Sequence, residues 1–138
     1  MNSTGIAEGS AIDIHSEGAA KVALKAFFRI ADAWGLDTEE QMMLLGGQTS
    51  TFGRLRDGHI SEGLPTETLE RISLVINIYA ALHTLLPDAA LADAWPRRPN
   101  SAPLFGGCDA LAKMLSGTFN DLQSVALYLE SHVSGTGT

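Results

Sequence analysis

The side chains best suited to chemistry in this sequence gather in one short polar segment. It holds four small polar residues followed by two arginines: Gln48, Thr49, Ser50, Thr51, Arg54 and Arg56. At the N-terminus of a helix, hydroxyl and amide groups can hydrogen-bond phosphates or base edges, and arginine binds phosphate or guanine in the major groove. Two arginines against one aspartate give residues 46–61 a local charge of +1. The pattern indicates a DNA-binding segment, and a helical hairpin that only packs is the alternative.

The elements around this segment have the proportions of a helix-turn-helix. The sequence predicts a short helix that begins near Thr38, with Gln41 reaching back to its cap as in a capping box. The helix ends at a Gly-Gly turn, and glycine suits such a turn because one residue there often needs a positive φ. A second short helix is predicted over residues 49–57, with Phe52 and Leu55 as inward anchors.

Groups that could carry catalysis or hold a metal are poorly arranged. The four histidines form no pair at the i, i+3 or i, i+4 spacing of helical metal ligands: His15, His59, His83 and His132. Cys108 can lie at a helix N-terminus, where a thiolate is favoured, but no base is identifiable to activate it. Glu39 and Glu40 diverge by about 100° on a helix and suit its first turn. We expect no enzyme, no cofactor and no metal site, and an enzyme using Cys108 is the alternative.

Composition sets the broad class. The chain has 138 residues, of which 45% are hydrophobic, and a net charge of −7, which argues against a charge-driven nucleic-acid coat or a polybasic membrane anchor. A single cysteine excludes an internal disulfide and indicates a reducing compartment. The N-terminus lacks the features of a signal peptide, and the longest apolar region, residues 72–86, is shorter than the roughly 20 residues that span a bilayer. We expect a cytoplasmic protein that makes no contact with a membrane.

Hydrophobic spacing along the chain is helical, which predicts an all-α fold. Phe27, Ile30 and Trp34 recur every three or four residues, and Gly35 follows as a helix stop. The longest helix is predicted over residues 66–86. Its apolar positions fill more than one face, which indicates burial against several neighbours or against another subunit.

The C-terminal half is predicted to contain three shorter helices, over residues 89–95, 109–115 and 118–133. An irregular loop rich in proline and glycine occupies residues 96–107. Trp95 is expected in the core, whereas Arg97 and Arg98 are expected on the surface.

A set of ordered motifs gives the sequence a family resemblance. In the N-terminal half they are Leu44-Leu45-Gly46-Gly47, Thr51-Phe52-Gly53-Arg54-Leu55-Arg56-Asp57-Gly58, Leu69-Glu70-Arg71-Ile72-Ser73 and Ile78-Tyr79-Ala80-Ala81-Leu82. In the C-terminal half they are Trp95, Arg98-Pro99-Asn100, Phe105-Gly106-Gly107, Ala110-Leu111, Ser116-Gly117 and residues 122–129. Together they resemble the bacterial Xre/MbcA/ParS antitoxins, the partners of RES-domain and ParT-like toxins, over roughly residues 20–131.

The resemblance implies a function. Such antitoxins are all-helical, often dimerise, and block a toxin that consumes NAD or transfers ADP-ribose from it by packing on its NAD cleft. The Xre-like half binds the operator of the antitoxin's own operon. Carried over to this chain, the operator contacts are the six polar residues of the DNA-binding segment, Gln48 to Arg56. The toxin contacts are Arg98, Asn100, Leu104, Phe105, Tyr128, Glu130, Ser131 and His132.

The expected organisation has four regions: a flexible segment at residues 1–18, the Xre-like region at 19–64, the long helix with the toxin-binding domain at 65–133, and a flexible tail at 134–138. The expected partners are the toxin, operator DNA whose binding the toxin can assist, and a second copy of the chain within a hetero-oligomer. The alternative is a dimeric helix-turn-helix transcription factor without a toxin partner.

Overall fold

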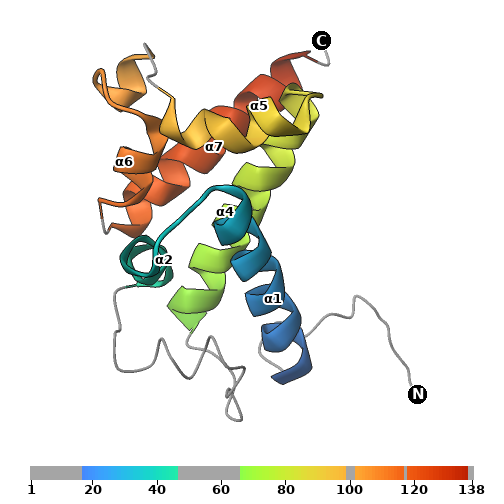
Figure 1. Cartoon of the computed structure of the whole chain (residues 1–138). Coiled ribbons are helices and arrows are strands. Elements are labelled where there is room, and N and C mark those ends of the chain that lie inside the picture. The colour runs from blue at the N-terminus through green and yellow to red at the C-terminus, as the bar shows by residue number, and fades with distance from the viewer. Residues whose placement is uncertain (1–16, 47–65, 99–101, 117, 137–138) are drawn as a thin grey trace, which may run out of the picture.

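A computed structural model describes residues 17–46, 66–98, 102–116 and 118–136 (Figure 1). The elements in these ranges are α1 (Glu17–Ala33), α2 (Thr38–Leu45), α4 (Thr66–Leu85), α5 (Ala89–Ala94), η2 (Trp95–Arg97), η3 (Pro103–Phe105), α6 (Ala110–Met114) and α7 (Phe119–Thr136), where η marks a 3-10 turn. Within the described residues the chain forms helices and connecting turns without a β-strand, which confirms the predicted all-α fold.

Helix ends lie close to the predicted ones. α4 ends one residue before its predicted end, and α5 stops at Ala94 because the 3-10 turn η2 takes over at Trp95. α1 begins inside the N-terminal segment predicted to be flexible, and α7 continues to Thr136, three residues beyond its predicted end at Val133. The helix predicted over residues 49–57 lies outside the described residues.

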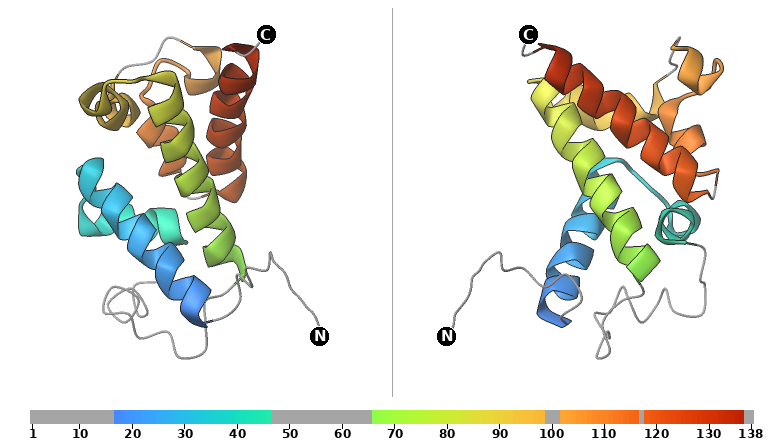
Figure 2. Two further views of the ribbon diagram at one scale, coloured as in Figure 1. Left: turned by 90° about the vertical axis from the view of Figure 1, so that its right-hand side faces the viewer. Right: turned by 180° about the vertical axis from the view of Figure 1, so that it is seen from behind.

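The centre of the fold is α4, which packs against α1, α2, α5 and α7. The left view of Figure 2 places α4 between α1 and α7. The side chains that α4 buries are Leu69, Arg71, Ile72, Val75, Ile78, Ala81 and Leu82. Neighbours in the same chain therefore account for the broad apolar surface that the sequence predicts for this helix.

The helices on either side of α4 each add one apolar stripe to the shared core. The stripe of α1 consists of Leu24, Phe27, Ile30 and Ala31, and that of α7 consists of Leu122, Val125, Ala126 and Leu129. Both stripes have the three- and four-residue spacing of an amphipathic helix. Burying one large apolar side chain stabilises a fold by about 1.5–3 kcal/mol, so this core is the main stabilising contribution.

Different helix ends lie at the two ends of the molecule. The N-terminal ends of α1 and α4 lie at one end, and the C-terminal end of α7 lies at the other in every view (Figures 1 and 2). Among the described residues, no helix combines the length and hydropathy needed to cross a membrane.

The joint between α6 and α7 depends on Asp121. Its Oδ1 accepts a hydrogen bond from Lys113 Nζ at 3.2 Å, and its backbone N–H donates to Thr118 Oγ1 at 3.2 Å. Hydrogen bonding from the Ser116 hydroxyl, and then from Lys113, lowers the pKa of the Asp121 carboxyl below its ordinary value of 3.8. The ionised carboxylate therefore stabilises the folded state.

We predict that Asp121→Asn lowers the free energy of unfolding at pH 7 and that this deficit shrinks in acid. Because the pKa is lowered in the folded state, the contribution is complete above about pH 4 and is lost as the pH falls through the folded-state pKa. Urea unfolding of both proteins at a series of pH values measures the difference. Asn120→Ala, at the exposed neighbouring position, serves as the control, and a deficit that does not change with pH contradicts the prediction.

Candidate functional site

The connection between α1 and α2 is a tight corner. Gly35 has a φ of +67°, a left-handed conformation that other residues rarely adopt. Its N–H donates to Asp32 O at 3.1 Å, and the Leu36 N–H donates to Ala31 O at 2.9 Å. These two bonds form a Schellman motif, which ends α1 at the glycine that the sequence predicts as its stop.

The start of α2 is capped one residue earlier than the sequence analysis predicts. Asp37, and not Thr38, is the N-cap: its Oδ1 accepts from the Glu40 N–H at 2.8 Å, and Glu40 Oε1 accepts from the Asp37 N–H at 3.0 Å. The predicted reach of Gln41 back to the cap is therefore wrong. The buried Gln41 side chain instead donates from Nε2 to Leu36 O at 2.9 Å, which satisfies a carbonyl inside the corner.

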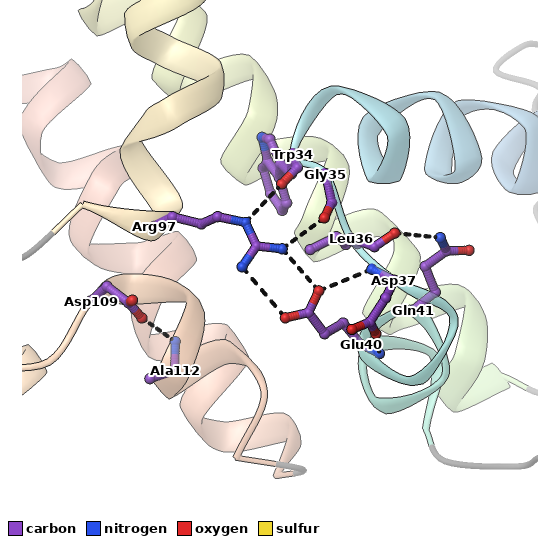
Figure 3. Close-up of polar contacts among 9 residues, drawn as sticks. All are labelled: Trp34, Gly35, Leu36, Asp37, Glu40, Gln41, Arg97, Asp109 and Ala112. Atoms are coloured by element: carbon purple, nitrogen blue, oxygen red, sulfur yellow. Dashed lines mark hydrogen bonds and ion pairs between the residues drawn. The ribbon is translucent and has the colours of Figure 1, made fainter.

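A side chain from the C-terminal half closes this corner. Arg97 Nε donates to Trp34 O at 3.1 Å, and its Nη2 donates to Gly35 O at 2.8 Å and to Glu40 Oε1 at 2.9 Å (Figure 3). Nη1 lies 3.5 Å from Glu40 Oε2. One guanidinium thus binds the last carbonyls after α1 and the carboxylate that caps α2.

The chemistry of arginine explains why it holds this place. A planar guanidinium offers several N–H donors in a fixed fork, and hydrogen bonds to charged groups are stronger than neutral ones. A positive charge also suits the C-terminal end of α1, where the helix dipole is negative. Although 44% of the Arg97 side chain is exposed, as the sequence analysis expects, its donors are engaged. No local sequence signal marks this role, because the partners lie 57 to 63 residues away.

The exit of α2 is fixed in a similar way. Gly46 has a φ of +113°, which confirms the need for a turn glycine at this position. A Cβ added to Gly46 would lie 3.7 Å from Nε of Arg71, which is buried and pairs with Glu67 Oε2 at 2.9 Å. The chain therefore leaves α2 directly above a buried cation of α4. The six candidate DNA contacts follow this exit and lie outside the described residues.

The C-terminal half contains a row of aromatic rings. The centroids of Trp95 and Phe105 are 5.9 Å apart, and those of Phe105 and Tyr128 are 5.3 Å apart, both edge to face. The ring of His132 continues the row at 4.5 Å from Tyr128, and its Nδ1 lies 2.9 Å from Tyr128 O. Edge-to-face pairs hold aromatic rings in defined positions. The row joins the segment after α5 to the last turns of α7.

This row brings together predicted toxin contacts from two distant parts of the chain. Phe105 is buried and supports the row from the core, so it offers no exposed surface of its own. Leu104 and Tyr128 are half-buried. The exposed members are Arg98, Glu130, Ser131 and His132. Asn100 lies outside the described residues.

Groups considered for other chemistry are spread apart. Cys108 is exposed and lies in the turn before α6, and His83 Nε2 contacts Asp93 Oδ1 at 2.8 Å between α4 and α5. In the ranges that the structure covers, no three His, Cys, Asp or Glu side chains come together in a group that could hold a metal ion.

The described part of the N-terminal half consists of two helices joined at a braced corner, a left-handed glycine at the exit of the second, and the long helix α4 that both pack against. Residues 13–77 match the family model described as the antitoxin Xre-like helix-turn-helix domain. The chain is also 40% identical over 114 residues to the uncharacterized protein y4oB of Sinorhizobium fredii. The aligned region covers 81% of this chain and 84% of that protein. The two proteins belong to one family, and residues 13–77 of this chain are similar to the antitoxin Xre-like helix-turn-helix domain. The matched domain belongs to a regulatory class of proteins and not to a class of enzymes.

We predict that Arg97→Lys lowers the free energy of unfolding by about 1–3 kcal/mol, because an ammonium group cannot bind two carbonyls and a carboxylate at once. Arg98→Lys, at the exposed next position, should stay within about 0.5 kcal/mol of the wild type. Denaturant unfolding measures both variants. Equal stabilities of the two variants would mean that the corner does not depend on the guanidinium.

Proposed function

We propose that this chain is the antitoxin of a toxin–antitoxin pair. Its C-terminal half covers the NAD site of a RES-domain or ParT-like toxin, and its N-terminal half binds the operator of its own operon. The observation that carries the proposal is the meeting of Phe105, Tyr128 and His132, at ring distances of 5.3 Å and 4.5 Å, in a chain whose residues 13–77 match an antitoxin domain.

The surface around this row has the mixed character of a protein interface. Phe105 packs edge to face against Tyr128, and the exposed ring of His132 lies tilted against it at a centroid distance of 4.5 Å. Leu127 is 58% exposed and shares the outer face of α7 with Glu130 and other polar residues. Interfaces combine anchored aromatic side chains with a polar rim, which is the arrangement found here.

Charge supports the same partner. The chain carries a net charge of −7, whereas a cleft that binds NAD must attract the two phosphates of that molecule. Opposite potentials on two proteins speed their encounter and fix their relative orientation. An acidic antitoxin is therefore a suitable partner for a basic, phosphate-binding cleft.

The operator-binding part rests on the matched domain and on the six polar residues that follow Gly46. A helix-turn-helix protein reads two half-sites as a dimer, so we include a homodimer, assembled with the toxin, in the proposal. A transcription factor without a toxin is the competing function, because the matched domain occurs in the N-terminal half only. Its distinguishing property is operator binding without any effect on NAD consumption.

The decisive experiment on the toxin uses the chain purified with the protein encoded next to it. We expect a stable complex and an NAD-consuming activity of the neighbour that the chain suppresses. The double variant Glu130→Gln with His132→Ala should weaken the complex about 10- to 100-fold, since interface side chains of this kind contribute on the order of 1–3 kcal/mol.

The control is Gln123→Lys, on an exposed turn of the same helix, because this change and Glu130→Gln each raise the net charge by one. Point variants are preferable to removing α7, which supplies Leu122 and Val125 to the core. Equal inhibition by the wild type and the double variant would move the toxin surface elsewhere. Operator binding without a complex and without suppression of NAD consumption would favour the transcription factor.

A separate prediction concerns DNA. Arg54→Ala with Arg56→Ala should weaken binding to the DNA upstream of the operon and flatten its salt dependence, because each lost phosphate contact reduces the log–log slope by roughly 0.9. Fluorescence anisotropy with a labelled duplex at several salt concentrations measures this effect. If affinity and slope stay at wild-type values, the DNA surface does not include these arginines.

A further inference from the structure

The described cations differ in what they contact. Arg71, Arg97 and Lys113 each pair with a carboxylate, and those pairs tie elements of the fold together. Lys25 and Arg29 are exposed, and neither forms an ion pair with any residue in the described part of the chain. The fold therefore does not require these two charges.

Both cations belong to one stripe on α1. Lys21, Lys25 and Arg29 follow one another at four-residue spacing, so they share one face of the helix, and all three are exposed. Lys21 to Arg29 spans about 12 Å at a rise of 1.5 Å per residue. We call this face the α1 stripe.

The α1 stripe has an unusual charge pattern for a helix in an acidic protein. Exposed helices commonly place an acidic residue four positions before a lysine, because such pairs stabilise the helix, whereas like charges at this spacing repel. Lys21 has Glu17 four positions before it, but Lys25 has a lysine four positions before it and an arginine four positions after it. Asp32 lies three positions beyond Arg29 but forms no ion pair with it in the described structure.

The position of the α1 stripe indicates its partner. Six of the nine lysines and arginines in the chain lie within residues 13–77, the helix-turn-helix domain: Lys21, Lys25, Arg29, Arg54, Arg56 and Arg71. The N-terminal end of α1 lies at the same end of the molecule as the start of α4 (Figures 1 and 2).

We propose that the α1 stripe binds the phosphate backbone of duplex DNA beside the bases read by the helix-turn-helix. Phosphates follow one another along each DNA strand, so Lys25 and Arg29, about 6 Å apart along α1, can each contact one of them. Contacts of this kind position a protein on DNA and carry no sequence information. The inference rests on the proposed operator binding and adds a second, sequence-independent contact surface to it.

The test measures the binding of two duplexes, the DNA upstream of the operon and a scrambled sequence, across a series of salt concentrations. Lys25→Gln and Arg29→Gln should each weaken both duplexes by the same factor and reduce the log–log salt slope by roughly 0.9, and the double variant by roughly 1.8. Asn120→Asp is the control, because it also lowers the net charge by one but lies at an exposed position in the other half of the chain. It should change neither affinity nor slope.

The outcomes separate this proposal from the operator-binding proposal. If the wild type binds and the Arg54 and Arg56 variant is impaired, but Lys25→Gln with Arg29→Gln matches the wild type, only the α1 stripe is wrong. If the double variant instead binds the purified toxin more weakly and DNA normally, the α1 stripe contacts an acidic protein surface and the proposal is overturned. If the wild type binds no duplex, with or without the toxin, both proposals fail. A thermal unfolding midpoint equal to that of the wild type shows for each variant that the compared proteins are folded.

Discussion

The structure depends on one helix that both halves of the chain bury. α4 presents Ile72 and Ile78 to a core formed by α1 and α2 on the N-terminal side and by α5 and α7 on the C-terminal side. The family match ends at residue 77, within α4. Neither half can keep its core without this helix, so the helix-turn-helix frame and the C-terminal surface form one folding unit. A substitution that disturbs α4 therefore destabilises both halves.

The contact of Arg97 with the corner between α1 and α2 is the second link between the halves, and it is polar where the first is apolar. Arg97 is followed at once by Arg98, the first of the proposed toxin contacts, while its own guanidinium holds the carboxylate of Glu40 at the start of α2. Arg97 therefore binds the corner between α1 and α2, and the next residue, Arg98, already belongs to the proposed toxin surface.

The sequence predicts those features whose cause is local. Helical spacing, the stop at Gly35 and the turn glycine Gly46 all depend on residues within one or two turns, and each is found as predicted. The cap at Asp37 could also have been predicted from the sequence, because an acidic residue followed three positions later by Glu40 is a capping pattern. The roles of Arg97 and Phe105 could not be predicted, because their partners are brought close only by the packing of α4 and α7. The residues proposed to read DNA lie outside the described part of the chain, so they stay predictions.

The two tryptophans of the chain lie in different halves and in different surroundings. Trp34 is buried under the corner that Arg97 closes, and its indole Nε1 has no hydrogen-bond partner in the described structure. Trp95 is half-buried and touches Phe105 at the start of the aromatic row. Because indole emission depends on polarity and on nearby groups, each half contains its own intrinsic fluorophore. With one tryptophan replaced by phenylalanine at a time, the light emitted by the other reports on the helix-turn-helix frame or on the C-terminal surface alone.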